Sequence, residues 1–291
     1  MLGIIGGSGV YNIDGLTNTR WVKAESAFGE PSDEVLIGEL PIDGLTRQSI
    51  AFLPRHGRGH RIPPSDINFR ANIDALKRLG VTDIVSVSAV GSLREHLAPG
   101  TFVIVDQFID RTFAREKSFF GNGLVAHVSM AHPVCSRLGA HLHEAAQQAG
   151  IAVSRGGTYL VMDGPQFSSL AESELYRSWN CDVIGMTNMP EAKLAREAEI
   201  CYATVAMVTD YDCWHPNHDD VTVDAIVKVL LANADKARAL VKSVAPRVQG
   251  DEAACQCGCR SALQHAIITA PEARDPAMVE KLSAVAGRVL K

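Results

Sequence analysis

The sequence predicts one α/β domain built on a mixed, largely parallel β-sheet with helices on both faces. Short apolar runs rich in β-branched residues alternate with segments whose apolar residues recur at helical spacing, which is the order typical of a parallel sheet. Most of these runs are too continuously apolar to leave one strand face in water, so both faces of the sheet should be covered. The chain of 291 residues is long enough to bury most of its apolar surface in one domain.

The individual elements follow from this alternation. The strands are expected at 2–6, 47–54, 82–90, 100–108, 156–164, 181–186 and 202–210. The helices are expected at 67–80, 133–150, 169–179, 190–200 and 221–248. Several helical segments follow Ser or Pro or end at Gly, which are common boundary residues, and the longest should end near Pro246.

The character of the sequence changes after Gln249. Residues 1–248 contain the alternating elements and should form the main domain, whereas 249–291 should be a helical extension packed on it. Cys255, Cys257 and Cys259 alternate within CQCGC, unlike the C-x-x-C pairs of zinc sites, so a structural or a redox-sensitive tail is favoured over zinc. The chain has seven scattered cysteines, which argues against a secreted disulfide framework.

The composition narrows the class of partner. Hydrophobic residues make up 46% of the chain, charged residues 21%, and the formal net charge is −5, so no basic face for nucleic acid is expected. The start, MLGIIGGSGVYN, lacks the basic segment of a signal peptide, and no apolar run approaches the roughly 20 residues that span a bilayer. We therefore expect a cytoplasmic protein with a small-molecule partner and no membrane association.

Three strand ends in the first part of the chain carry groups that suit an anion. The stretch GIIGGSG passes from a buried strand into a turn whose N–H groups could hold phosphate, although a simple tight turn explains it equally well. Arg55 and His56 follow the next strand directly, where Arg offers a planar fork and His a donor near neutral pH; a solvated basic loop is the weaker alternative. Ser88 and the residues up to Ser92 end a third strand with hydroxyl and N–H groups.

Two carboxylates, Asp210 and Asp212, follow a further buried strand. If the strand continued through them, alternation would put both side chains on one face and Tyr211 on the other. Two close carboxylates resist double ionisation, so the pair should share a proton and offer one donor and one acceptor. This suits a 6-aminopurine better than a 6-oxopurine. A divalent-metal pair and an exposed Asx turn are the alternatives, and Trp214 argues against full exposure.

Other candidate ligand contacts lie at the passages from strand to helix. Phe167 could stack on a flat ring, although core packing is the usual role of Phe and Met. Three more side chains lie where a ligand crossing the sheet edge would be: Ser168, Met186 and Thr187. Three carboxylates of the helical segments are expected on the surface: Glu172, Glu191 and Glu197.

Together these motifs resemble the trimeric purine nucleoside phosphorylase family. The resemblance rests on GIIGGSG, PRHG followed by His, SAVGSLRE, GTFVIVDQFIDRT, DGPQFSS and MTNMPEAKLAREAEICYATVAMVTDYDCW, in the family's order from Gly3 to about Lys242. It implies a nucleoside phosphorylase-like fold and a homotrimer or dimer of trimers, with residues 1–248 as the catalytic domain. It also implies phosphorolysis of 5′-methylthioadenosine to adenine and 5-methylthioribose 1-phosphate, with inorganic phosphate as co-substrate and no metal or cofactor.

The resemblance assigns roles to individual residues. Phosphate would be held by Ser8, Arg55, His56, Ser88, Ala89 and Thr187. The nucleoside would be bound by Phe167, Ser168, Met186, Asp210, Asp212, Val223, Val227 and His127, the last from a neighbouring subunit. Asp210 and Asp212 would be the catalytic pair, with Asp210 supplying a hydrogen bond or proton to purine N7 while phosphate attacks C1′.

A few positions depart from the family pattern. Ser8 stands where Thr is common, and Asp163 and Gln166 replace the Glu and Arg of the EGPRFS motif, which bears on substrate preference. Members that act on 6-oxopurines usually have Asn where Asp210 stands. A 6-oxopurine phosphorylase and a non-catalytic purine-binding protein are therefore the alternatives, the first opposed by the two acids and the second by the phosphate-type loops. Some relatives from hot environments carry a Cys-X-Cys disulfide comparable with CQCGC.

Overall fold

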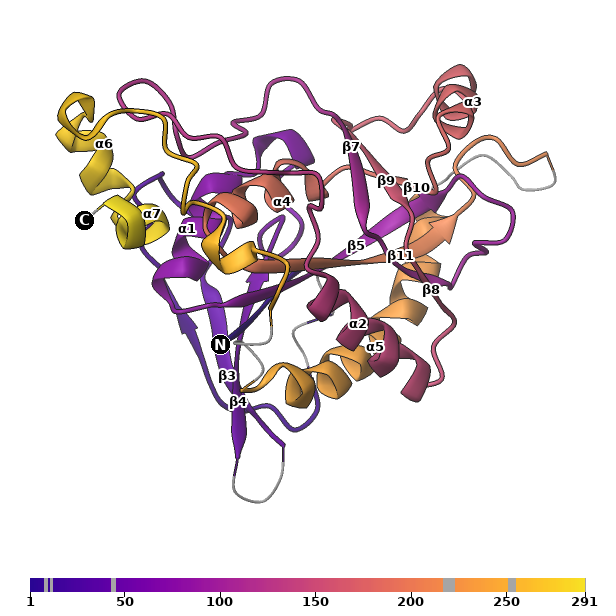
Figure 1. Ribbon diagram of the computed structural model, residues 1–291. Helices are drawn as coiled ribbons and strands as arrows, with labels where there is room; N and C mark the ends of the chain where they lie inside the picture. Colours follow the sequence, from indigo (N-terminus) through magenta and orange to yellow (C-terminus); the bar gives the residue numbers. More distant parts are fainter. Residues whose placement is uncertain (8–9, 11–12, 43–45, 217–222, 251–254, 291) are drawn as a thin grey trace.

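The computed structural model describes residues 1–291 except 8–9, 11–12, 43–45, 217–222, 251–254 and 291 (Figure 1). In this part of the chain the strands form one 11-stranded sheet, and helices lie on both of its faces. The predicted fold class, a mixed and largely parallel sheet flanked by helices, is confirmed.

The strands are β1 (Leu2–Gly6), β2 (Thr17–Val22), β3 (Val35–Pro41), β4 (Arg47–Pro54), β5 (Asp83–Ser92), β6 (Phe102–Ile104), β7 (Gln107–Arg111), β8 (Val153–Arg155), β9 (Thr158–Met162), β10 (Val183–Gly185) and β11 (Cys201–Asp210). The helices are α1 (Phe69–Arg78), α2 (Ser136–Gln148), α3 (Leu170–Ser178), α4 (Asn188–Glu197), α5 (Val223–Val248), α6 (Pro276–Lys281) and α7 (Ser283–Leu290).

The centre of the sheet consists of four parallel strands, β4, β1, β5 and β11. Because parallel neighbours end at the same edge, the segments that follow these strands come together there. On one side β3 and β2 continue the sheet in antiparallel pairing. On the other side β10 pairs antiparallel with the end of β5, and β9 and β7 follow in parallel.

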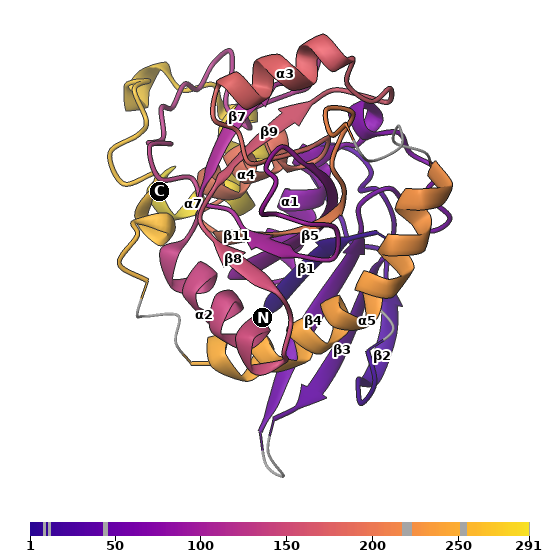
Figure 2. The ribbon, with the colours of Figure 1, turned by 90° about the vertical axis from the view of Figure 1, so that its right-hand side faces the viewer.

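Two hydrophobic cores lie on opposite faces of the sheet. One is covered by α1, α4 and α7, and the other by α2 and α5 (Figures 1 and 2). Strand alternation divides β11 between them: Tyr202 and Ala206 belong to the first core, and Ala203 and Val205 to the second. The central strands are therefore buried on both faces, which explains their continuous apolar runs.

The structure differs from the expected elements in several places, and the buried strand β3 and the short strand β8 are not among the expected strands. The single strand expected at 100–108 is wrong, because β6 and β7 are separate and pair with different partners. The sequence does not predict β2, whose side chains are exposed and whose sequence has no apolar run. The long helix agrees with expectation, since it ends at Val248 with Pro246 inside its last turn.

The C-terminal segment packs against α1 and the start of β11. Leu263, Leu282 and Val285 join the same core as α1. The carboxylate of Glu199 accepts hydrogen bonds from the Leu263 N–H at 2.9 Å and from the Arg288 guanidinium at 2.7 Å. The boundary between the main domain and the extension at residue 248 stays a prediction. Among the described residues, no helix has both the length and the apolar character required to cross a membrane.

Candidate active site

Three of the segments predicted to face phosphate lie at one edge of the sheet. The strand β1 pairs in parallel with both β4 and β5, so their carboxyl ends are neighbours. The backbone N–H after β4 donates to the Gly6 carbonyl oxygen at 2.9 Å, which fixes this segment to the end of β1. Ser8 lies outside the described residues. The predicted phosphate residues on the other two strand ends are Arg55, His56, Ser88 and Ala89.

The Arg55 guanidinium is buried in a polar network of its own. Its Nε and Nη2 donate to the two oxygens of Glu191 at 2.8 and 3.1 Å. Nη2 also donates to Ser86 Oγ at 2.6 Å, and Nη1 donates to the Val87 carbonyl oxygen at 3.0 Å. Burial alone would lower the pKa of Arg55, but the charge of Glu191 raises it above its ordinary value. These bonds leave at most one of the five guanidinium N–H groups for a ligand.

Two of the carboxylates expected on the surface are buried instead, one of them in this network. Glu191 is buried and accepts further hydrogen bonds from Ser86 Oγ at 2.6 Å and from the Tyr202 hydroxyl at 2.9 Å. Glu197 is also buried and accepts from the Phe119 N–H and the Ser118 hydroxyl, each at 2.7 Å. Burial raises the pKa of Glu197 to about 7. Helical spacing cannot distinguish these residues from Glu172, which is exposed.

His56 is buried beside Arg55. Burial, and then the positive charge of Arg55, lower the pKa of His56 to about 4. Its Nδ1 lies 2.9 Å from the Ile62 carbonyl oxygen, so a neutral ring donates from Nδ1 and presents Nε2 as an acceptor. The ligand-free site therefore offers an acceptor here, in place of the donor expected near neutral pH.

Ser88 and Thr187 approach one another through Tyr159. The Ser88 and Tyr159 hydroxyl oxygens are 3.3 Å apart. A Cβ atom on Gly185 would lie 2.1 Å from the Tyr159 hydroxyl, so this approach requires glycine at the end of β10. Thr187 follows at the N-terminus of α4, where its buried Oγ1 lies beside the Tyr159 hydroxyl but forms no well-aligned hydrogen bond among the described residues. A buried hydroxyl in this state is what an anion-binding site would contain before its ligand arrives.

Asp210 and Asp212 are brought together by a turn and not by strand alternation. β11 ends at Asp210 with a register shift, and Asp212 has a left-handed φ of 52°. The Asp212 N–H donates to Asp210 Oδ1 at 2.8 Å. A Cβ atom on Gly91 would meet Asp210 Oδ1 at 2.9 Å and Asp212 Cβ at 3.3 Å, so both acids lie against this glycine of β5.

The acid pair is shielded from water. Asp212 is 7% exposed, which contradicts the exposed-turn alternative although an Asx-type hydrogen bond is present. Burial raises the pKa of both carboxyls, and the charge of Asp210 raises the pKa of Asp212 further. The Ser173 and Ser168 hydroxyls lie beside the Asp212 carboxylate and partly offset this rise in its pKa, but Oδ2 forms no well-aligned hydrogen bond in the described part of the chain. The pair can therefore hold a proton to higher pH than isolated aspartates and can present it to a ligand.

The loop before α3 lies against the turn that carries the acids. The Cys213 thiol donates to the Ser168 carbonyl oxygen at 3.4 Å. Met186 packs on Gly164 at the start of the same loop, where a Cβ atom would lie 2.4 Å from its sulfur. The Phe167 ring is 44% exposed and is free to stack on a planar ligand. Phe167, Ser168 and Met186 thus lie on segments that adjoin the acid pair.

Arg115, which the sequence does not single out, organises these segments. Its Nη1 donates to the carbonyl oxygens of Met186 and Met189, each at 2.7 Å, and its Nη2 donates to that of Asp163 at 3.0 Å. The Asp163 carboxylate also forms an ion pair with Arg115 Nε at 3.1 Å and accepts from the Phe113 N–H at 3.0 Å. Asp163 therefore ties the start of this loop to Arg115 and to the Phe113 backbone.

The remaining predicted substrate residues lie outside this cluster or cannot be placed in it. Val223 begins α5, and its side chain lies outside the described residues. Val227 is 44% exposed on α5. The His127 N–H donates to the Ala266 carbonyl oxygen at 2.9 Å, in a segment paired with the C-terminal extension. Their roles at the substrate stay predictions.

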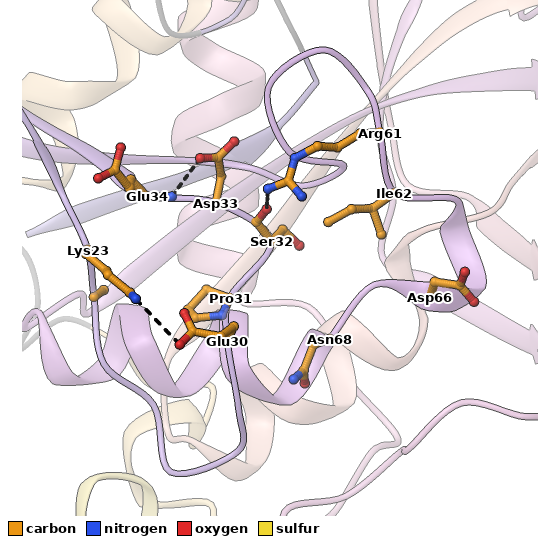
Figure 3. Close-up of a pocket in the computed structure, with 11 residues that line it drawn as sticks. Lys23, Glu30, Pro31, Ser32, Asp33, Glu34, Arg61, Ile62, Asp66 and Asn68 are labelled. Carbon is orange, nitrogen blue, oxygen red and sulfur yellow. Dashed lines mark hydrogen bonds and ion pairs between the residues drawn. The ribbon is translucent and has the colours of Figure 1, made fainter.

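Two pockets lie away from the predicted site residues. One, of about 420 Å³, lies beside the loop after β2 (Figure 3). Its charged groups already pair, Lys23 with Glu30 at 3.7 Å and Arg61 with the Ser32 carbonyl oxygen at 2.9 Å. The other, of about 450 Å³, lies beside Cys257.

Comparison with known proteins identifies similar chains over nearly the whole length. The model of the phosphorylase superfamily matches residues 1–246. The chain is 66% identical to the S-methyl-5'-thioadenosine phosphorylase of Rhodospirillum rubrum over 290 residues, covering 100% of this chain and 97% of that protein. The corresponding protein of Geobacter sulfurreducens is 54% identical, with coverage of 99% and 98%.

Solved structures agree with this grouping. A methylthioadenosine phosphorylase sourced from an antarctic soil metagenomic library superposes with a TM-score of 0.91 at 49% identity, covering 98% of each chain. Methylthioadenosine phosphorylase from Schistosoma mansoni, solved in complex with adenine, superposes with a TM-score of 0.79 at 33% identity, covering 91% of this chain and 99% of that one.

Proposed function

Because the chain belongs to the phosphorylase superfamily, we propose that it catalyses the reversible phosphorolysis of S-methyl-5′-thioadenosine to adenine and 5-methylthioribose 1-phosphate. The observation that carries this proposal is the buried acid pair, Asp210 and Asp212, against Gly91. One protonated and one ionised carboxyl match the N7 acceptor and the amino donor of adenine. The names of the similar proteins support the methylthio nucleoside as the substrate.

The phosphate end of the proposed site lies at the neighbouring strand ends. The hydroxyls of Thr187 and Ser88 would donate to phosphate oxygens. His56 would accept from the phosphate O–H, since its Nδ1 is already directed at a carbonyl oxygen. Arg55 would contribute one N–H group while Glu191 holds its guanidinium in place. Ser8 is proposed for this site on the family motif alone.

In the proposed reaction, a phosphate oxygen attacks C1′ as the bond from C1′ to N9 breaks. The bonding electron pair passes into the purine, and the developing negative charge is neutralised when Asp210 donates a hydrogen bond or proton to N7. Asp212 would accept from the exocyclic amino group, and repulsion between the two carboxyls would favour one proton on the pair. The ribose would lie between Met186 and the phosphate, and Phe167 and Ser168 would border the base.

The family resemblance also supports two proposals beyond the single chain. A homotrimer or dimer of trimers would bring His127 of a neighbouring subunit to the methylthio group, with Val223 and Val227 near it. A cytoplasmic location would suit an enzyme that salvages purine and methionine precursors. Catalysis would need no metal or cofactor, since phosphate is the nucleophile and no redox change occurs.

The test compares methylthioadenosine, adenosine, methylthioinosine and inosine, each with and without phosphate. Adenine release should require phosphate and be fastest with methylthioadenosine. The variant Asp210→Asn should lower the rate with 6-aminopurines and shift preference toward 6-oxopurines, because the amide can donate to O6. Asp235→Asn, which changes an exposed aspartate on α5, should behave as the wild type. Phosphate-independent release, or unchanged base preference in Asp210→Asn, would contradict the proposal.

A further inference from the structure

Four cysteine sulfur atoms from separate parts of the chain meet beside α2. Cys135 immediately precedes α2, Cys201 begins β11, and Cys255 and Cys259 belong to the C-terminal extension. All four Sγ atoms lie within 4.8 Å of one another, and those of Cys135 and Cys255 are 3.8 Å apart. Three of the residues are buried and Cys255 is half-buried. Figure 2 shows the extension passing α2 on its way to α7.

We propose that these four cysteines bind one zinc ion that fastens the extension to the catalytic domain. Zinc in structural sites takes four ligands in a tetrahedron with Zn–S bonds of about 2.3 Å, which places the sulfur atoms about 3.8 Å apart. The observed spacing fits this geometry without a large movement of the backbone. An all-thiolate set selects zinc over the hard cations, which prefer oxygen ligands.

A disulfide and an iron–sulfur cluster are the alternatives to zinc, and both fit the geometry less well. A disulfide requires two sulfur atoms about 2.0 Å apart, and all seven cysteines are free in the structure. An iron–sulfur cluster places several iron and sulfide atoms between its cysteines, so the four thiolates lie farther apart than a single tetrahedral ion would hold them. The close spacing of the four sulfur atoms, all within 4.8 Å of one another, fits a site for a single metal ion.

The surroundings suit the negative charge of a zinc tetrathiolate. Four thiolates around one Zn²⁺ carry a net charge of −2, which needs compensation when it is buried. The Arg137 guanidinium lies beside Cys201, where it also forms an ion pair with the Asp83 carboxylate. A second guanidinium, that of Arg196, is close to Cys259 and donates to the Cys257 carbonyl oxygen at 3.4 Å. Each thiol would release its proton on binding, so no oxidant or reductant is required.

The fifth nearby cysteine, Cys257, provides an internal control. Its sulfur is 3.8 Å from that of Cys135, but it is outside the set of four that are mutually close. It lies 3.0 Å from the Ser136 hydroxyl, beside the second pocket. Cys257 therefore adjoins the cluster through Cys135 without belonging to the set of four, and the variant Cys257→Ser tests that assignment directly. The local spacing does not predict zinc because the other two ligands come from distant positions in the sequence.

The experiment measures metal content and stability in the full-length protein. Protein purified without chelator should contain one zinc ion per chain. After denaturation with chelator and without reductant, a thiol assay should find seven free thiols per chain. The double variant Cys255→Ser/Cys259→Ser should lose the zinc, whereas Cys257→Ser and Cys181→Ser should keep it. A chelator should lower the Tm of the wild type and of both controls, but not the Tm of the double variant.

Each outcome decides the proposal. Reconstitution with Co²⁺ should give the intense visible bands of tetrahedral thiolate coordination in the wild type and in Cys257→Ser, and not in the double variant. Protein that folds without bound metal, or a thiol count of five with an intact Cys-X-Cys disulfide, would overturn the zinc site. Equal loss of zinc in Cys257→Ser would overturn the assigned ligand set. If the double variant does not fold, metal content and the cobalt spectrum of the wild type and Cys257→Ser still provide the test.

Discussion

The buried, neutral His56 should make the proposed phosphate site discriminate between phosphate and sulfate. A neutral ring whose Nδ1 donates to Ile62 can accept through Nε2 from the O–H of HPO4²⁻, but sulfate has no proton to donate. Sulfate would require a protonated ring. With a pKa of about 4, protonating His56 at neutral pH costs about 4 kcal/mol, since each pH unit corresponds to about 1.4 kcal/mol.

Competitive inhibition by sulfate should therefore strengthen as the pH falls. Binding of sulfate should take up one proton, so its inhibition constant should fall about tenfold for each pH unit as the pH falls from the pKa of His56 in the sulfate complex toward about 4, its pKa in the free protein. The KM for phosphate, expressed as the concentration of HPO4²⁻, should change much less. Both constants are measured by steady-state kinetics over this range in a buffer without sulfate.

The variant His56→Gln separates this reasoning from a general effect of charge. Glutamine can donate and accept a hydrogen bond but does not titrate, so the pH dependence of sulfate inhibition should disappear while phosphate still binds. A sulfate inhibition constant that is independent of pH in the wild type would refute the reasoning. The same slope in His56→Gln would assign the proton to another group.

Three further predictions concern the groups that support the site. Gly91→Ala should lower kcat/KM for the nucleoside at least about tenfold, because the new methyl group displaces the acid pair. The KM for phosphate should change little. Gly121→Ala, at an open position, is the kinetic control. Arg115→Lys should raise the KM for the nucleoside about tenfold or more, since lysine cannot replace all the hydrogen bonds to the Met186 segment. Unchanged kinetics would show that Arg115 does not position this segment. The folded pKa of Glu197 is raised, so the stability that its proton contributes is complete below about pH 4.5 and is lost as the pH rises through about 7. Urea denaturation should show wild-type stability falling by about 3 kcal/mol over that range relative to Glu197→Gln, and parallel curves would argue against the buried proton.

The sequence predicts the parallel centre of the fold because those strands are buried on both faces. Long apolar runs such as β11 report this burial directly. The exposed strand β2 has no such signal, and its pairing with β3 depends on a distant segment. Helices α1 and α2 agree with their expected segments because their apolar periodicity is regular.

The candidate site shows the same division between local and distant information. The spacing of Asp210 and Asp212 predicts their proximity, although a turn and not strand alternation brings it about. The roles of Gly91 and Glu191 could not be predicted from the sequence, because they depend on contacts between segments that are distant in the chain. A glycine near a strand end and a glutamate in a helix have many ordinary explanations, and only their partners in space distinguish them.

Strand β5 connects the two ends of the proposed reaction. Ser88, at the phosphate end, and Gly91, under the acid pair, are three residues apart on one strand, which spans about 10 Å. At Ser88 this strand is paired with β11, and at Gly91 with β10 and the end of β11. The separation between nucleophile and leaving base is therefore set by covalent geometry, and one inserted residue would change it by about 3.3 Å and reverse the side-chain faces. The surrounding loops can vary to accommodate a different 5′ substituent while the distance between the phosphate end at Ser88 and the acid pair at Gly91 stays the same.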